Sequence, residues 1–185
     1  MSYTILTSQV RPYSITTLRE HTRVSTNDFD SELRRSWYAA TSDIEKRAGI
    51  LLRQCTVRGD LLGSPDGYVF PVGPVTNLAG ITMTNQETGA VLTQGRTGDY
   101  IVDMTNQNPT IRVMNRSSFS NRNVPFSIEF DAGYDSQNIL DDIEIAALEL
   151  AAHHFENRES TSPFQVYTVP SSVWSILASY GTAKI

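Results

Sequence analysis

Hydrophobic positions recur with a helical period in the first part of the chain. Between residues 28 and 52 they follow one another at steps of three and four, with polar residues between, which places them on one side of a helix. They are Phe29, Leu33, Trp37, Ala40, Ile44, Ala48 and Leu51. A shorter helix is expected over residues 14–24, because the hydroxyl of Ser14 can accept a hydrogen bond from a free amide of its first turn.

A third helix is expected over residues 141–159, and it is apolar around most of its circumference. Asp141 and Asp142 begin it, and their charges suit the positive end of a helix dipole. So wide an apolar side needs two surfaces to pack against, and a neighbouring subunit can supply one of them. The residues that we assign to subunit packing are Ile143, Ala147, Leu150, His154 and Phe155.

Between residues 54 and 134 the hydrophobic period changes to two, and Gly, Pro, Asn and Asp interrupt short β-branched runs. This alternation is typical of half-buried strands joined by turns. Strands are expected at about 55–61, 75–84, 90–93, 100–104, 110–114 and 126–131. The order of elements predicts an α+β fold: a small helical bundle with an appended antiparallel β region and a C-terminal arm.

The arm comprises residues 163–185 and follows a single domain over residues 1–162. Its apolar segment is too short to be a stable helix in water, because an isolated helix needs ~12–15 residues. It therefore needs a partner surface, either on its own domain or on another protein, and the proline-containing spacer before it favours the second. Its candidate contact residues are Val173, Trp174, Ile176, Leu177, Tyr180 and Ile185.

Charge and cysteine content exclude several classes of protein. The formal net charge of −5 argues against a monomer that binds DNA by its phosphates. A single cysteine, Cys55, cannot form an internal disulfide framework. We expect no secretory signal, because no Lys or Arg precedes an apolar segment in residues 1–10. We also expect no membrane span, since no stretch approaches the ~18 apolar residues that a span needs.

A cluster of His153, His154, Glu149 and Glu156 is the one candidate for metal or acid–base chemistry. Adjacent helical residues point ~100° apart, so the two imidazoles are poorly placed to hold one ion. We interpret His153 and Glu149 as a surface pair four residues apart. No nucleotide-binding or α/β-hydrolase motif occurs. The sequence therefore predicts no catalysis, no metal and no cofactor.

Four stretches, in this order along the chain, match the pattern of one known family. They are Ile15–Val24 followed by Asp28 and the long helix, Val69–Val75, Phe126–Tyr134, and Ile145–Glu159. In the last of these, His153–Glu159 is the part closest to the family pattern. The chain resembles the head–tail connector, or head-completion adaptor, family of tailed phages and gene transfer agents. Thr22 stands where that family usually has leucine.

The resemblance implies a non-enzymatic ring, commonly of twelve copies, in the virion at the head–tail interface, assembled in the host cytoplasm. It implies that the ring docks below the portal protein, continues the DNA channel and presents its far face to a stopper or tail-terminator protein. Residues 1–162 would be the adaptor domain, and the contact residues of the arm would bind the portal. Genomic DNA would pass without sequence-specific binding, and no membrane would be involved.

Two alternatives remain open at this point. One is a β-rich receptor- or carbohydrate-binding tail module, and the other is a metal-dependent hydrolase that uses the His and Glu side chains of the third helix. Assembly size separates them. A large closed ring favours the adaptor, a trimer favours the tail module, and a monomer with bound metal favours the hydrolase.

Overall fold

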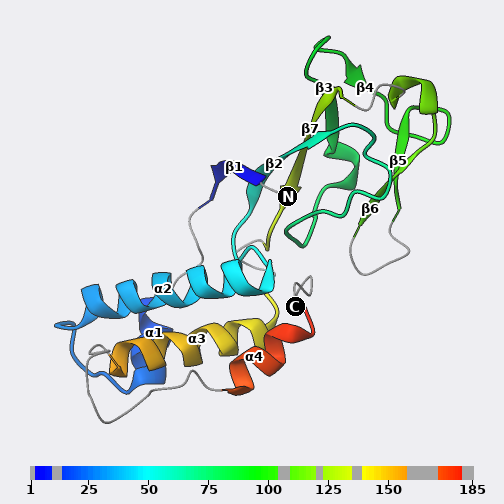
Figure 1. Cartoon of the computed structure of the whole chain (residues 1–185). Coiled ribbons are helices and arrows are strands. Elements are labelled where there is room, and N and C mark those ends of the chain that lie inside the picture. Colours follow the sequence, from blue (N-terminus) through cyan, green and yellow to red (C-terminus); the bar gives the residue numbers. More distant parts are fainter. Residues whose placement is uncertain are drawn as a thin grey trace. The chain divides into compact units, whose positions relative to one another are not determined.

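The computed structural model describes residues 3–9, 14–103, 109–119, 123–134, 139–157 and 171–180. It contains helices and antiparallel sheets, so the predicted α+β class is confirmed. The chain divides into two compact units (Figure 1). The β unit comprises residues 1–10 and 53–134, and the helical unit comprises residues 11–52 and 135–185.

The β unit is built on a five-stranded antiparallel sheet with strand order β1-β2-β7-β3-β4. Its strands are β1 (Tyr3–Ser8), β2 (Cys55–Leu62), β3 (Thr82–Asn85), β4 (Val91–Leu92) and β7 (Pro125–Ala132). A separate two-stranded sheet pairs β5 (Tyr100–Asp103) with β6 (Thr110–Val113). The strands expected near residues 55, 90, 100, 110 and 126 are therefore present, with shifted ends.

The long pair β2 and β7 organises the core of the β unit. Val57 lies opposite Phe130, and Gly59 lies opposite Ile128. The ring of Phe130 meets that of Phe70 edge-on, with centroids 4.8 Å apart. A side chain at position 59 would force Tyr68 to move, because a Cβ there would lie 2.2 Å from the hydroxyl oxygen of this buried residue.

Two parts of the β unit differ from the prediction. Of the strand expected over residues 75–84, only β3 forms. Before it, Leu78–Gly80 makes a 3₁₀ turn, in which the Asn77 side chain accepts a hydrogen bond from the Gly80 amide at 3.0 Å. Asparagine competes with a strand in this way because its side chain bonds the nearby backbone. The sequence also gave no sign of β1, whose side chains are almost all exposed.

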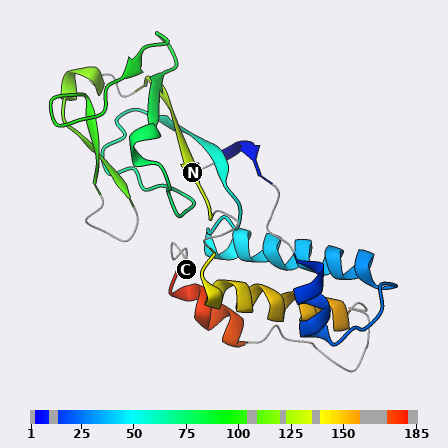
Figure 2. The same ribbon diagram turned by 180° about the vertical axis from the view of Figure 1, so that it is seen from behind.

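The helical unit contains α1 (Ile15–Thr22), α2 (Asp30–Ala48), α3 (Asp141–Glu156) and α4 (Ser171–Ala178). α2 and α3 run side by side, and both α1 and α4 contact this pair (Figures 1 and 2). α2 and α3 pack on each other through their buried sides. The buried hydrophobic residues of the unit include Leu18, Leu33, Trp37, Ala40, Ile44, Ala48, Ile50, Leu51, Leu52, Ile143, Ala146, Ala147, Leu148, Leu150, Ala151, Val173 and Leu177.

Local signals explain the ends of the first two helices. Ser14 caps α1 as expected, since its hydroxyl oxygen accepts a hydrogen bond from the Thr17 amide at 3.3 Å. α2 ends earlier than expected, because Gly49 takes a left-handed conformation with φ 67°. The expected end of α3 at residue 159 and the start of the arm at residue 163 lie outside the described residues. The expected division at residue 162 stays a prediction, although α4 belongs to the same compact unit as α3.

Candidate functional site

The expected arm folds onto its own chain, as far as the structure describes it. α4 contacts α3 and α2, and its Val173 and Leu177 side chains are 0% and 2% exposed. These two residues therefore belong to the core of the helical unit. The sequence left open whether this segment packs on its own domain or on another protein. In the structure α4 packs on its own domain, against the apolar side of α3.

The other side of α4 remains accessible. Trp174 is half-buried, with the guanidinium of Arg47 4.7 Å from its ring centre. Ile176 is half-buried, and exposed Tyr180 donates a hydrogen bond from its hydroxyl to the Asp142 carboxylate. Ile185 lies outside the described residues. Of the six candidate portal-binding residues, the structure therefore brings Trp174, Ile176 and Tyr180 to the surface.

Most of the residues that we assign to subunit packing are buried by their own chain and not by a neighbouring subunit. Ile143, Ala147 and Leu150 are buried by their own chain, where α1, α2 and α4 surround α3. His154 and Phe155 are half-buried. The Nε2 atom of His154 lies 3.4 Å from a carboxylate oxygen of Asp43. The ring of Phe155 meets that of Phe29 edge-on at 6.2 Å between centroids. The second surface that α3 requires is therefore supplied within the subunit.

The polar cluster of α3 does not form the pair that the sequence predicts. Glu149 accepts a hydrogen bond from the Ser172 hydroxyl at 3.4 Å. The Nδ1 atom of His153 lies 3.1 Å from the side-chain nitrogen of Asn157. Glu149 therefore bonds to α4, and His153 bonds to Asn157 at the end of its own helix. In the part of the chain that the structure describes, no three His, Cys, Asp or Glu side chains are grouped so that they could hold a metal ion.

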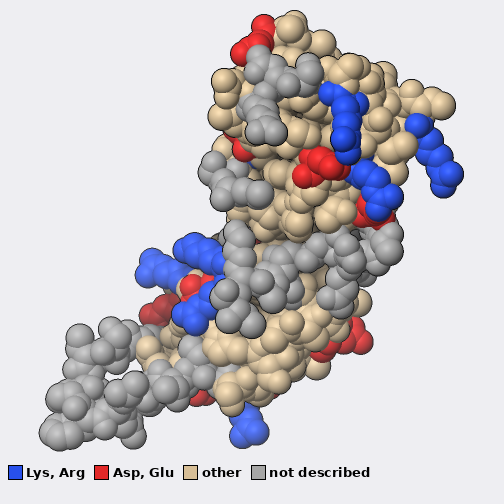
Figure 3. Space-filling view, turned by 45° about the vertical axis from the view of Figure 1, so that its right-hand side comes forward, with Lys and Arg blue, Asp and Glu red and all other residues tan. Residues whose placement is uncertain are grey.

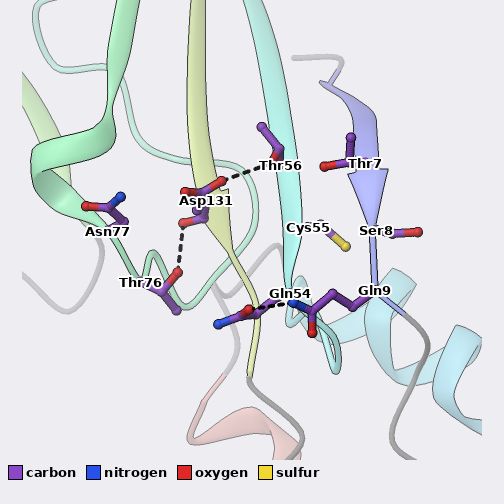
Figure 4. Close-up of a pocket in the computed structure, with 9 residues that line it drawn as sticks. All are labelled: Thr7, Ser8, Gln9, Gln54, Cys55, Thr56, Thr76, Asn77 and Asp131. Carbon is purple, nitrogen blue, oxygen red and sulfur yellow. Dashed lines mark hydrogen bonds between the residues drawn. The ribbon is translucent and has the colours of Figure 1, made fainter.

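A polar pocket opens in the β unit where β1, β2 and β7 come together with the loop before β3 (Figure 4). Its volume is about 480 Å³, and it is lined by Thr7, Ser8, Gln9, Gln54, Cys55, Thr56, Thr76, Asn77 and Asp131. The Asp131 carboxylate accepts a hydrogen bond from the Thr56 hydroxyl at 3.0 Å. Four segments that are distant in the sequence build this pocket, so no local motif predicts it. Its lining offers hydroxyls, amides, one carboxylate and a buried thiol.

Two carboxyl groups have a lowered pKa, and both serve the fold. The Arg19 guanidinium, which donates to Asp30 with its Nε atom at 2.7 Å, lowers the pKa of that carboxyl. This contact joins the end of α1 to the start of α2. The pKa of Asp99 is lowered by the Ser118 hydroxyl and then by the Thr93 amide, which both donate to it. Neither carboxyl belongs to the pocket lining.

On the face drawn in Figure 3, the charged side chains of the described residues are dispersed. Figure 3 shows Lys and Arg in small groups, with Asp and Glu close to several of them, and no broad surface of one sign on that face. None of the helices described is both long and apolar enough to cross a membrane.

Comparison of structures finds the same fold over the full length of the chain. A chain in the virion of a native gene transfer agent (GTA) particle matches with a TM-score of 0.74 and 18% identity. Chains in the neck of an empty GTA particle, computed with C6 symmetry, and in the neck of a native one, computed with C12 symmetry, match with TM-scores of 0.69 and 0.66 at 18% identity. Each match covers 100% of this chain and 97% of the other. No family model and no curated protein matches the sequence.

Proposed function

We propose that this chain is a structural protein of a virion neck, where it acts as a head–tail connector adaptor. The observation that carries the proposal is the full-length likeness in fold to chains in the neck of GTA particles. Both units of the chain take part in that likeness, so it is a likeness to a whole subunit. The four sequence stretches that resemble the connector family support the same role independently.

In this proposal the chain forms a ring, with twelve copies as the expected number. The neck structures that share its fold were computed with C6 and C12 symmetry, and both agree with a ring of twelve. The ring would dock below the portal protein and receive a stopper or tail-terminator protein on its far side. It would be a non-enzymatic component that lets genomic DNA pass without sequence-specific contact.

The outer side of α4 is the proposed portal contact. Val173 and Leu177 hold the helix on its own subunit, which leaves Trp174, Ile176 and Tyr180 to meet the portal. Large aromatic side chains commonly carry most of the binding energy of a protein interface. A helix already ordered on its subunit also loses less conformational entropy on docking than a free arm would.

The test is co-production of the chain with the portal protein of the same particle, followed by native mass spectrometry and electron microscopy. We expect a portal complex that carries a ring of twelve copies, which adds about 247 kDa, twelve times the 20.6 kDa of the chain. A chain that stays monomeric beside assembled portal would contradict the proposal. A free trimer would instead favour the tail-module alternative.

A further inference from the structure

Two outward-facing stripes of the helical unit carry opposite charge. The basic stripe lies on α2 and consists of Arg35, Tyr38, Ala39, Ser42 and Lys46. The acidic stripe lies on α3 and consists of Asp141, Glu144, Ile145, Ala152 and Glu156. In both stripes the charged residues are exposed. Within the described residues, none of these charged side chains has an ion-pair partner in its own chain.

The middle of each stripe is apolar or small. Ile145 is 49% exposed on the acidic stripe, and Tyr38 is 39% exposed on the basic stripe. Beside Ile145 lie Ala152 and Leu148, and Leu148 is only 9% exposed, so it adds little bulk to this surface. Beside Tyr38 lie the small side chains of Ala39 and Ser42. Small residues let two helices approach closely, and an exposed isoleucine gains from being covered by a tyrosine ring.

The charges at the ends of the stripes have matching separations. Arg35 and Lys46 lie ~17 Å apart along α2 at the usual helical rise, and Glu144 and Glu156 lie ~18 Å apart along α3. An α3 helix laid along an α2 helix can therefore bring each carboxylate near one cation. A shift of register by more than about one helical turn would leave a cation without a carboxylate at one end, so the pairing of charges limits the register.

The two stripes cannot meet within one molecule. α2 and α3 already contact each other through their buried sides, and each stripe lies on the side of its helix that faces away from the core. The complement of each stripe must therefore come from a second copy. A contact between two different surfaces of identical subunits is heterologous, and it closes into a ring when the rotation between copies allows.

We propose that the acidic stripe of α3 docks on the basic stripe of α2 of the next copy in the ring. This inference rests on the proposed ring function and names the surfaces through which the ring closes. It replaces the subunit contact expected from Ile143, Ala147 and Leu150, which the chain buries itself. Every copy uses both stripes, so each copy repeats the same contact.

The test uses two charge-reversed variants of the full chain, each assembled with portal protein. The first carries Arg35→Glu with Lys46→Glu, so that both of its stripes are negative. The second carries Glu144→Lys with Glu156→Lys, so that both are positive. Either variant alone places like charges across every contact, and we expect the yield of rings to fall more than about tenfold.

An equimolar mixture of the two variants should assemble again. When the variants alternate, every contact joins a negative stripe to a positive one, and a ring of twelve accommodates six copies of each. Native mass spectrometry should detect mixed rings near the wild-type mass. Circular dichroism and the thermal midpoint check that each variant folds. Arg96→Glu with Arg116→Glu is the matched control, because it reverses two exposed charges of the β unit and should leave ring yield unchanged.

The outcomes separate this inference from the proposed function. If wild-type chain forms rings and either variant alone does so equally well, or the mixture fails to assemble although both variants are folded, the stripes are not the contact. A mixed complex at only twice the 20.6 kDa of the chain would mean a self-complementary pair and would also overturn the inference. If wild-type chain forms no ring with portal, the proposed function fails and this inference fails with it.

Discussion

Asp99 stabilises the β unit by gathering donors from two separate segments. Its carboxylate accepts hydrogen bonds from the Thr93 amide at 2.8 Å and the Thr93 hydroxyl at 2.9 Å. The Asn115 side-chain amide at 3.3 Å and the Ser118 hydroxyl also donate to it. These donors favour the ionised form, which explains the lowered pKa of Asp99.

We predict that Asp99→Asn lowers the free energy of unfolding by about 1 kcal/mol at pH 7, because an amide cannot accept all of these bonds. The folded pKa lies below the unfolded one, so the contribution is present above the unfolded pKa and is lost as pH falls through the folded pKa. The difference between variant and wild type should therefore shrink between about pH 5 and pH 2. Urea unfolding across this range measures it. Asp103→Asn, which alters the surface pair with Arg112, is the control and should cost less.

Trp37 is the largest side chain in the core of α2, and it is 6% exposed. Trp37→Ala should lower the free energy of unfolding by ~3–5 kcal/mol, because it leaves a large cavity between packed helices. Its neighbour Tyr38 is 39% exposed, so Tyr38→Ala should cost well under half as much. Denaturant unfolding of the two purified variants makes the comparison. Equal stabilities would show that Trp37 is not a core residue.

At the scale of elements, α4 is held to the helical unit by two buried side chains. Leu177→Ala should lower the free energy of unfolding by ~2–4 kcal/mol, whereas Ser175→Ala on the exposed side should have little effect. Calorimetry of both variants is the measurement. A thermal midpoint unchanged in Leu177→Ala would mean that α4 does not pack on α3 in solution.

The same element carries the proposed portal contact, so its two sides must be tested separately. Removing the whole arm would also remove Val173 and Leu177 from the core and would confuse folding with binding. Trp174→Ala with Ile176→Ala changes only half-buried positions. We expect portal affinity to fall by about tenfold or more, with the subunit still folded, as measured by calorimetric titration. Unchanged affinity would move the portal contact to another surface.

At the scale of the whole molecule, the net charge predicts how the proposed ring would interact with DNA. Twelve copies at −5 each would carry −60, and such a ring repels phosphates except where a local surface is basic. We expect no retention of double-stranded DNA by assembled rings at about 0.15 M salt in a filter-binding assay. Retention that decreases steeply with added salt would contradict this expectation, because it would indicate several direct contacts to phosphates.

The sequence by itself determined the elements whose patterns are local. α2 was predictable because its apolar residues repeat every three or four positions, and the helix buries that one side. β2 and β7 were predictable because their buried positions largely alternate along each strand. The Ser14 cap followed from one side chain and one turn. Each of these signals lies within a few residues, which is why composition and period were sufficient.

Only the tertiary structure decided which surfaces meet. β1 has no alternating pattern, because it joins the sheet through backbone hydrogen bonds while its side chains remain exposed. The apolar circumference of α3 indicated that it needed cover, but periodicity does not identify the cover, and α1, α2 and α4 of the same chain supply it. The pocket depends on how distant segments pack, and so does the exposure of the two charged stripes, although each stripe lies on one helix. Period and propensity report the polarity of each side of an element, whereas the neighbour on each side is determined by long-range contacts.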